Sequence, residues 1–470
     1  MRTFTAISGP CWFNRRGAAL GAVFGLSPDS HHAQQVHRQG KAASLPAKLG
    51  RLLPALLAAV LVPMATGAPS VAAAPGPPPV TVLTPAAHLG TGDIFVTPTS
   101  STGKYANGPE ILDTHGNVVW FHAIPETQTA ADFRAQRYGG HQVLTWWQGT
   151  GLGGLSCGTD YIYNDQFQQI ATVRAGNGLC ADGHEFLITP QNTALITIYQ
   201  KTTANLTSIG GPADQTVING IVQEIDIATG QVLFQWNSAD HIPYSQSEQP
   251  LPAKPSQPWS WFHLNAVKVD TDGNLLISAR HTWATYKVDR LTGDVLWTLG
   301  GKASSFTLAA APGQVLDQAG ELFAWQHDPE PLGNDTYTFF DDEANGASPP
   351  LLPYSRAITV QLSVTTHVAT LAAADNQPEG LLASAAGNAQ TTSDGNLFVG
   401  WGLLPYFSAF DPSGTLIFDA RFPPGVYSYR AYFLLPAIQS RNLATIRPHH
   451  AGGKPVGREG ATRRPLGPVH

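Results

Sequence analysis

The sequence predicts an all-β protein, organised as a six-bladed β-propeller in a single large domain. Two kinds of β-hairpin alternate along the chain, and hydrophobic patterns with the period of a helix are almost absent. Glycine and proline, the residues of turns, number 47 and 37 among 470 residues. Two hairpins form a unit of four strands, and about six units of roughly 50 to 70 residues are typical of a propeller.

The first kind of hairpin has an apolar strand that reaches an aspartate, a turn with glycine, and a second strand with an aromatic residue. Its clearest copies are residues 111–121, 224–236, 287–299 and 407–422. Two further copies, 161–173 and 357–371, keep the strands without the glycine. The plan returns about once per 50 to 70 residues, which is the size expected of one enlarged propeller blade.

The second kind of hairpin lies between copies of the first. It is found at residues 141–147, 185–199, 265–280, 334–342 and 389–402. A pair of β-sandwiches would also contain many short strands, but it would not require this alternation. The repeat therefore favours the propeller, in which loops converge around a central channel and often carry the site.

Residues 47–74 are predicted to be a secretory signal peptide. Lys48 and Arg51 come before the apolar run 52–62, and small residues at 71–74 offer an Ala-x-Ala cleavage site. A membrane anchor is the alternative, although the run is short for a span of about 20 residues. We therefore expect a secreted protein with no stable membrane span after cleavage.

These boundaries divide the chain into four segments. Residues 1–46 are predicted to be a disordered or misassigned leader, which precedes the signal peptide at 47–74. Residues 75–436 form the propeller, and the Arg-, Gly- and Pro-rich stretch 437–470 forms a disordered basic tail. The formal net charge is −6, which argues against a nucleic-acid partner. The oligomeric state is not indicated.

Cys157 and Cys180 are predicted to form a disulfide. An exported chain with two cysteines outside its leader favours one bond, and two buried free thiols are the alternative. A hairpin at 161–173 would bring the two cysteines roughly opposite each other. The bond would brace the loop that leads to His184.

The hairpin at residues 261–281 carries polar side chains at its open end. If Asp272 and Gly273 form a two-residue turn, Asn265 faces Arg280, and His263 lies on the same side of the sheet. In this register His281 points to the opposite face. The planar fork of Arg280, with amide and imidazole donors beside it, suits an oxyanion such as sulfate or phosphate.

Two more histidines occupy similar positions in neighbouring units. His184 lies just before a strand in the preceding unit, and His327 lies in the following one. We expect His184, His263 and His327 to converge at the mouth of the channel. A three-histidine metal site in a hydrolase is one alternative, but Arg280 in the cluster argues against a bound cation. A propeller that binds a ligand without catalysis is another. No cofactor and no metal are expected.

Several stretches of the chain resemble the arylsulfotransferases, in particular the actinobacterial and fungal branch of that family. The stretches that carry the resemblance are CADGHEFLITPQNTALITIY, IVQEIDIATGQVLFQWNSADHIP, WFHLNAVKVDTDGNLLISARHTWATYKVDRLTGDVLWTLGGKASSF, FAWQHDPE, AGNAQTTSDGNLFVGWG and SYRAY. After SYRAY the chain departs from the family pattern. The resemblance implies a six-bladed propeller and a nucleotide-independent sulfotransferase that moves a sulfuryl group from a phenolic sulfate ester to a phenol.

The resemblance also implies roles for five residues in a ping-pong mechanism. His327 in Trp-Gln-His would be the nucleophile that becomes sulfo-histidine. Arg280, with His263 and Asn265, would hold the sulfuryl oxygens, and His184 would be a second grip or a proton donor to the leaving phenoxide. The aromatic residues near these positions would form the wall for an aryl group or pack the blades; they are Trp259, Trp261, Phe262 and Trp325.

Overall fold

The computed structural model describes residues 75–151 and 153–434. This part of the chain is almost entirely β-structure, as predicted, with 26 strands, one short α-helix (α1, Ser238–His241) and three 3₁₀ turns. The predicted leader, signal peptide and basic tail lie outside the described residues. Within the described residues, no helix has the length and apolar character needed to cross a bilayer.

Four of the sheets have the four or five antiparallel strands of a propeller blade, apart from β17, which adds in parallel. The first contains β26 (Val426–Leu434), β2 (Asp93–Ser100), β3 (Glu110–Leu112) and β4 (Val118–Phe121). The second contains β13 (Leu264–Val269), β14 (Leu275–Ala279), β15 (Ala284–Val288) and β16 (Val295–Leu299). The third contains β18 (His327–Gly333), β19 (Thr336–Asp341), β20 (Arg356–Ser363), β21 (Val368–Asn376) and β17 (Thr307–Ala310). The fourth contains β22 (Asn388–Thr391), β23 (Leu397–Gly400), β24 (Tyr406–Phe410), β25 (Leu416–Arg421) and β1 (Thr81–Thr84).

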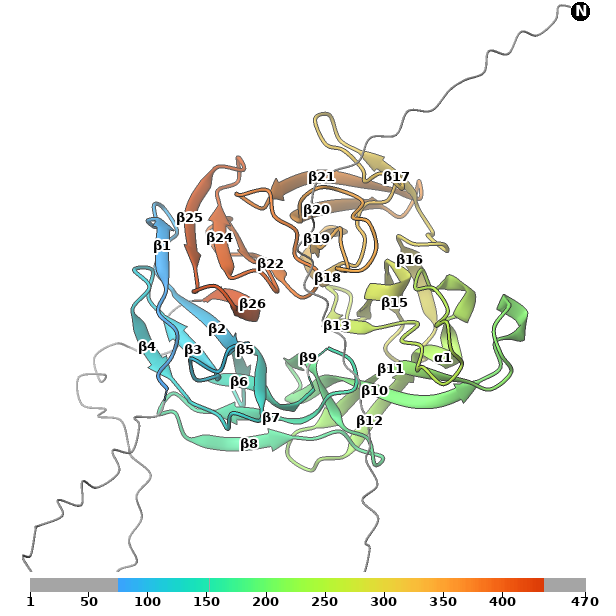
Figure 1. Cartoon of the computed structure of the whole chain (residues 1–470), viewed down its shortest axis with the longest axis horizontal. Helices are drawn as coiled ribbons and strands as arrows, with labels where there is room; N and C mark the ends of the chain where they lie inside the picture. The colour runs from blue at the N-terminus through green and yellow to red at the C-terminus, as the bar shows by residue number, and fades with distance from the viewer. Residues whose placement is uncertain (1–74, 152, 435–470) are drawn as a thin grey trace, which may run out of the picture. The chain divides into compact units, whose positions relative to one another are not determined.

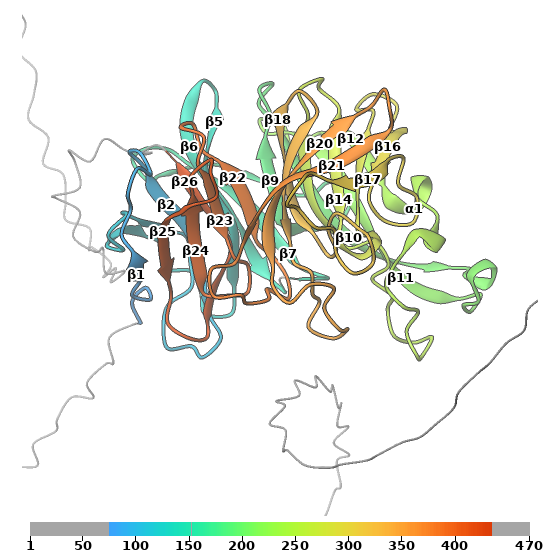
Figure 2. The same ribbon diagram turned by 90° about the horizontal axis from the view of Figure 1, so that it is seen from above.

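A fifth sheet has eight strands. It contains β5 (Thr129–Tyr138), β6 (His141–Thr150), β7 (Cys157–Tyr163), β8 (Gln169–Val173), β9 (Ala181–Ile188), β10 (Thr193–Ala204), β11 (Gln215–Asp226) and β12 (Val232–Asn237). The sheets surround a common centre in a propeller-like arrangement (Figure 1). From the side, their strands run between two faces at which the loops gather (Figure 2).

The hairpin at 261–281 has a different register from the one that its sequence predicts. Its turn is longer, because the N–H of Asp270 donates to the carbonyl of Asn274. Val267 therefore pairs with Ile277, and a bulge at Asn265 shifts the register again. The prediction of a two-residue Asp-Gly turn is wrong, since the asparagine after the glycine closes a wider turn.

This shift of register decides which side chains enter the core. With a two-residue turn at Asp272 and Gly273, Leu276 would share a face with Val267. In the structure it pairs with Lys268 and packs into the core shared with the next blade. Val267 and Ile277 belong to the core around Trp261 and Phe262. Trp259, Trp261, Phe262 and Trp325 are all at most 5% exposed, and they pack the blades.

The innermost strands carry β-bulges near the centre of the molecule. Register shifts occur at 131–134 in β5, 182–186 in β9, 264–266 in β13, 327–330 in β18 and 428–431 in β26. A bulge adds one residue to a strand and re-aims the side chains beside it. In a regular strand, side chains point alternately to the two faces of the sheet, and some of these polar residues would point into the packed interior between blades. The bulges allow them to point to the centre of the molecule instead.

Candidate active site

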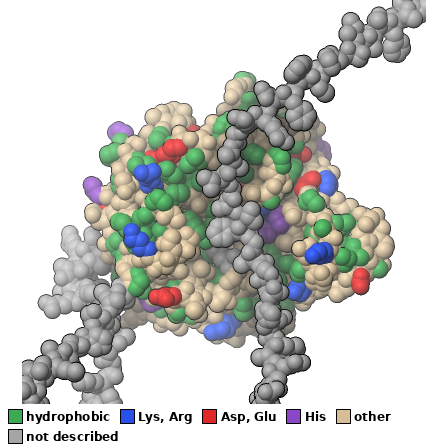
Figure 3. Space-filling model, viewed as in Figure 1, with side chains coloured by type: hydrophobic (Ala, Val, Ile, Leu, Met, Phe, Trp, Pro, Cys, Tyr) green, Lys and Arg blue, Asp and Glu red, His purple; other side chains and the backbone are tan. Residues whose placement is uncertain are grey.

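A cavity of about 610 Å³ lies on one face of the propeller. Four of the five predicted site residues line it: His184, His263, Arg280 and His327. The fifth, Asn265, does not. Histidine side chains are visible near the middle of the face shown in Figure 3. These four side chains come from positions up to 143 residues apart in the sequence.

His184 lies within the bulge of β9 and is only 2% exposed. Its Nδ1 atom contacts Oδ1 of the buried Asp182, two residues earlier. The other carboxylate oxygen of Asp182 accepts a hydrogen bond from the Ser156 hydroxyl. A carboxylate on one ring nitrogen fixes the orientation of an imidazole and leaves Nε2 for the cavity.

His327 begins β18, and a carboxylate orients it in the same way. Its Nδ1 lies 2.6 Å from Oδ2 of Asp342, which follows β19. The backbone N–H of Ala386 donates to Nε2 at 3.2 Å. Because an N–H donates only to a nitrogen with a free lone pair, the proton of His327 resides on Nδ1, facing Asp342.

The environment of His327 also keeps its ring neutral. The side chain is 1% exposed, and burial is the main reason that the pKa of His327 falls well below its usual value of 6.5. The positive charge of Arg280 and the nearby His184 lower this pKa further. A neutral imidazole with a lone pair on Nε2 has the form of a nitrogen nucleophile.

Among the described residues, Arg280 is the buried cation that has no carboxylate partner. It follows β14 in a 3₁₀ turn, is 5% exposed, and donates from Nη2 to the carbonyl oxygens of Ser384 and Ala344. Within the described part of the chain no acidic side chain forms an ion pair with it, and its Nε has no acceptor. The other buried cations do pair with carboxylates; they are Arg134, Lys268, Lys287, Arg356 and Arg430. Burial of an unpaired guanidinium is costly unless an anion joins it.

His263 and His281 face each other at the edge of the cavity, with ring centroids 4.6 Å apart. We expected His281 on the opposite side of the sheet, and the structure differs because residues 280–282 curl into a 3₁₀ turn. Burial, followed by the charge of Arg280, lowers the pKa of His281 to about 3. The pKa of His263 is also far below its usual value, chiefly because of burial. Both rings are neutral near pH 7.

Asn265 lies behind the cavity wall. Its side-chain amide donates to the carbonyl of Gln326 at 2.6 Å, and the residue is fully buried. The bulge at this position turns the side chain toward the next blade. Asn265 therefore fixes the backbone immediately before His327. It can influence the cavity only indirectly, through the position of His327.

A network of buried charges lies next to the cavity residues, and sequence reasoning did not identify it. Arg430 pairs with Asp132 at 3.0 Å and with Glu185 at 3.1 Å, and Lys268 pairs with Asp328 at 2.8 Å. Burial raises the pKa of Glu185, but Arg430 and Lys268 outweigh this and hold it at about 2. The network joins β5, β9, β13, β18 and β26 at the centre of the molecule.

The network and the cavity are linked through the backbone. Glu185 follows His184, Asp328 follows His327, and Arg430 follows the cavity residue Tyr429. In each of these strands a cavity residue is followed directly by a charged residue. This pattern could not be recognised from the sequence, because it depends on where the bulges lie. The Asp-Gly-His sequence at 182–184 was the clearest local signal of a carboxylate that orients a histidine.

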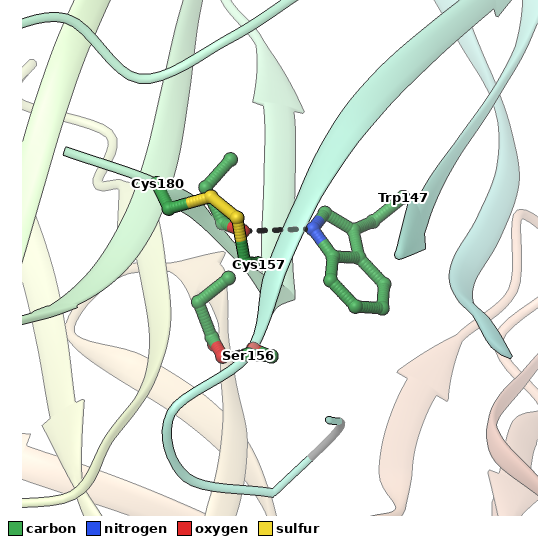
Figure 4. The surroundings of a disulfide bond; sticks show 6 residues. Trp147, Ser156, Cys157 and Cys180 are labelled. Carbon is green, nitrogen blue, oxygen red and sulfur yellow. Dashed lines mark hydrogen bonds between the residues drawn. A yellow bond between two sulfur atoms is a disulfide. The ribbon is translucent and has the colours of Figure 1, made fainter. Parts of the chain in front are cut away.

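The predicted disulfide between Cys157 and Cys180 is confirmed (Figure 4). It ties β7 to β9, which pair next to it through Gly158 and Ala181. The hairpin between the cysteines does not by itself bring them together, because the pairing of β7 with β9 is also needed. Trp147 donates from its indole N–H to the carbonyl of Ala181 at 3.0 Å, which fixes the start of the strand that carries His184.

No set of three or more His, Cys, Asp or Glu side chains among residues 75–151 and 153–434 is placed to hold a metal ion. The histidines of the cavity instead turn toward Asp182, Asp342 and backbone carbonyls.

The fold and the cavity define a propeller-like protein with a buried, histidine-lined cavity that contains an unpaired arginine. A family model described as Arylsulfotransferase (ASST) matches residues 134–423, and the chain belongs to this family. No curated protein matches the sequence significantly.

Solved structures are similar to the chain only at low sequence identity. A protein of unknown function from Bacteroides caccae is 11% identical, with 73% of this chain and 99% of that chain covered and a TM-score of 0.43. A putative 6-phosphogluconolactonase from Bacteroides uniformis is 10% identical, with 73% and 100% covered and a TM-score of 0.39. A streptogramin B lyase is 10% identical, with 73% and 88% covered and a TM-score of 0.37.

Proposed function

We propose that the protein is a nucleotide-independent sulfotransferase, which moves a sulfuryl group from a phenolic sulfate ester to a phenol in two steps through a sulfo-histidine. One observation carries the proposal: the unpaired, buried guanidinium of Arg280 lies in the same cavity as the neutral, carboxylate-oriented His327. An anion grip and a nitrogen nucleophile in one cavity are what sulfuryl transfer requires.

In the first step the donor ester binds with its sulfuryl oxygens toward Arg280. The lone pair of His327 Nε2 forms a bond to sulfur while the bond from sulfur to the phenolic oxygen breaks. The sulfuryl group thus takes the place of the Ala386 N–H that meets Nε2 at rest. The ring becomes more positive as the N–S bond forms, and Asp342 on Nδ1 stabilises that charge.

The phenoxide leaves with the electron pair of the broken bond. His184 is the proposed donor of a proton to this oxygen, because it lines the cavity and Asp182 supports its Nδ1. In the second step His184 Nε2 takes the proton of an acceptor phenol, and the phenol oxygen attacks sulfur. The N–S bond then breaks, and the lone pair returns to His327. Charge stabilisation and positioning supply most of the acceleration in such a transfer.

The test is a single-turnover measurement with an aryl sulfate and no acceptor. We expect one equivalent of phenol per protein in a burst, and ping-pong kinetics when a phenol acceptor is added. The protein should then carry one sulfuryl group on His327, detected by mass spectrometry at neutral or basic pH. His327→Ala should lose both burst and turnover.

The other outcomes of this experiment are equally informative. A burst retained by His327→Ala would reject the assignment of the nucleophile. Binding of the aryl sulfate with neither burst nor turnover would identify a ligand-binding propeller. Continuous release of phenol without an acceptor would identify water as the acceptor. In His184→Ala and His263→Ala, a slow burst is expected, because these residues assist the transfer without bonding to sulfur.

We also infer that the propeller has six blades. The eight-stranded sheet joins two four-stranded halves, β5–β8 and β9–β12, through a single residue pair between β7 and β9. The innermost strands contact one another in the closed order β5, β9, β13, β18, β22, β26. Hydrogen–deuterium exchange that shows β5–β8 and β9–β12 opening independently supports this count, and joint opening as one unit contradicts it.

The disulfide between Cys157 and Cys180 supports the proposal that the protein is exported, because such bonds persist in oxidising compartments. Fractionation of the native producer tests this inference. Recovery of the protein outside the cytoplasm, with residues 1–74 removed, is the expected result; a full-length cytoplasmic protein would contradict it.

A further inference from the structure

We infer that the hydroxyl of Tyr429 is an additional binding group of the cavity, which donates a hydrogen bond to the sulfuryl group held by Arg280. This inference rests on the proposed function and deepens it, because it adds a neutral donor to the histidines and the arginine. Tyr429 belongs to β26, the strand that precedes β2 in its blade, far in sequence from the other site residues.

The hydroxyl of Tyr429 is buried without a partner. The residue lines the cavity and is 4% exposed, yet its oxygen has no hydrogen-bond partner among the described residues. By contrast, the nearby Tyr199 donates its hydroxyl to the carbonyl of Leu264. Buried polar atoms without a partner are uncommon in native proteins, so each needs an explanation such as a ligand.

The ring of Tyr429 is firmly placed beside the reacting groups. It stands perpendicular to the His184 ring, with centroids 5.5 Å apart, and the guanidinium of Arg430 lies 5.2 Å from its centroid. Its backbone carbonyl accepts from the N–H of Gly387 at 2.9 Å. Ala386, which precedes Gly387, donates its backbone N–H to Nε2 of His327.

The hydroxyl also lies within electrostatic range of Arg280. Burial lowers the pKa of Arg280, whereas Asp342, Tyr199 and Tyr429 act in the opposite direction. Burial raises the pKa of Tyr429 well above its usual value, so the hydroxyl keeps its proton and acts as a donor. A neutral donor next to a guanidinium can bind a sulfuryl oxygen without the repulsion that a carboxylate would bring.

The substitution Tyr429→Phe tests the inference because it removes one hydroxyl and little else. The probe is an aryl sulfonate, whose carbon–sulfur bond prevents transfer, so that binding is measured without turnover. We expect its Kd to rise on the order of 10- to 100-fold, the effect of one hydrogen bond to a charged group. The melting temperature should stay unchanged or rise, because a buried hydroxyl without a partner is removed.

Tyr199→Phe is the matched control. It deletes a buried tyrosine hydroxyl that does have a partner, so the melting temperature should fall while the Kd of the aryl sulfonate stays within about twofold. A Kd within about twofold of wild type in Tyr429→Phe would overturn the inference. A loss of stability in that variant, with unchanged binding, would do the same.

The Arg280→Lys variant separates this inference from the proposed function. If Arg280→Lys no longer binds the aryl sulfonate while Tyr429→Phe binds it normally, the anion site is supported and the role of Tyr429 is rejected. If the wild-type protein does not bind the sulfonate at all, the proposed site falls and the role of Tyr429 falls with it. Weaker binding in both variants supports both statements.

Discussion

His327 and Asp342 are joined through Nδ1 and Oδ2 at 2.6 Å, and both are at most 1% exposed. The same relationship joins His184 to Asp182 in the same cavity. In each pair the carboxylate holds Nδ1; Nε2 of His184 is left for the cavity, whereas Nε2 of His327 accepts the backbone N–H of Ala386, a residue of the cavity wall. The histidines are thus positioned before any substrate binds, which removes part of the reorganisation from the reaction.

Replacement of Asp342 by asparagine should impair transfer while leaving the fold intact. The amide keeps the size of the carboxylate but can donate to Nδ1, which would place the proton of His327 on Nε2 and block the attack. We expect kcat to fall on the order of 10²-fold or more, with a matching loss of burst rate. The exposed Asp165→Asn is the control. A kcat within a few-fold of wild type would show that Asp342 does not select the tautomer.

Replacement of Arg280 by lysine should not be a mild change. Lysine keeps the charge but loses the planar fork that can meet two sulfuryl oxygens. The expected decrease in kcat is on the order of 10²-fold or more, similar to the loss of one preorganised donor. Steady-state kinetics of the variant, beside the exposed Arg421→Lys, measures it. Full activity would place Arg280 in a purely structural role.

Removal of the disulfide should lower both stability and activity. The bond closes a loop between positions separated by 23 residues, and the chain-entropy model gives about 3 kcal/mol for a loop of this size. Replacing Cys157 and Cys180 by serine should therefore reduce the free energy of unfolding measured with urea. Activity should fall as well, because Ser156, next to Cys157, supports Asp182 and through it His184.

Two results would contradict this prediction. Non-reducing peptide mapping of the wild type that recovers both thiols free would show that the bond is absent in solution. An unfolding free energy unchanged by the double substitution would show that the bond does not stabilise the native state. Ser156→Ala separates the two effects, since it should affect activity more than stability.

The low pKa of His327 predicts an unusual dependence on pH. Because the folded protein holds this pKa well below 6.5, the ring stays neutral as the pH falls past 6.5, and kcat/KM should not decline there. Stability behaves differently: the unfolded chain takes up a proton below about pH 6.5 and the folded chain does not. The free energy of unfolding should therefore decrease as the pH falls from 6.5 toward the folded pKa.

Measurements of kcat/KM and of urea unfolding between pH 5 and pH 8 test both statements. His327→Asn should reduce the loss of stability at acidic pH, because it removes one group that binds a proton only when unfolded. A decline of kcat/KM with a midpoint near 6.5 in the wild type would mean that the His327 ring titrates as it does in water.

The sequence alone determined the class of fold and most of the strands. The alternating hairpins at 287–299 and 407–422 appear as β15–β16 and β24–β25, because period-2 patterns and Asp/Gly turns are local signals. The pairing of Cys157 with Cys180 was also predictable, since there was no other candidate outside the leader. The residues His184, His263, Arg280 and His327 were identified by motif, and the fold brings them to one cavity.

Only the tertiary structure decided how these residues act. A two-residue turn was predicted for the hairpin at 261–281, and one additional residue in that turn moved Leu276 to the other face. The bulge at Asn265 places this residue behind the cavity wall, although it was expected in the site. The 3₁₀ turn at Arg280 brings His281 into the cavity lining, although it was expected on the opposite face. Bulges depend on contacts between blades, which no local pattern of residues contains.

The partners that tune the site come from equally distant parts of the chain. Asp342, Ala386 and Tyr429 reach His327 and His184 from other strands and loops. The neighbours of Arg280 in the sequence do not show that it lacks a carboxylate partner. The other buried cations at the centre are paired with acids from distant parts of the chain, and Arg280 could have been paired in the same way. The sequence supplies the groups, and the closed ring of sheets decides which of them remain unpaired and available to a ligand.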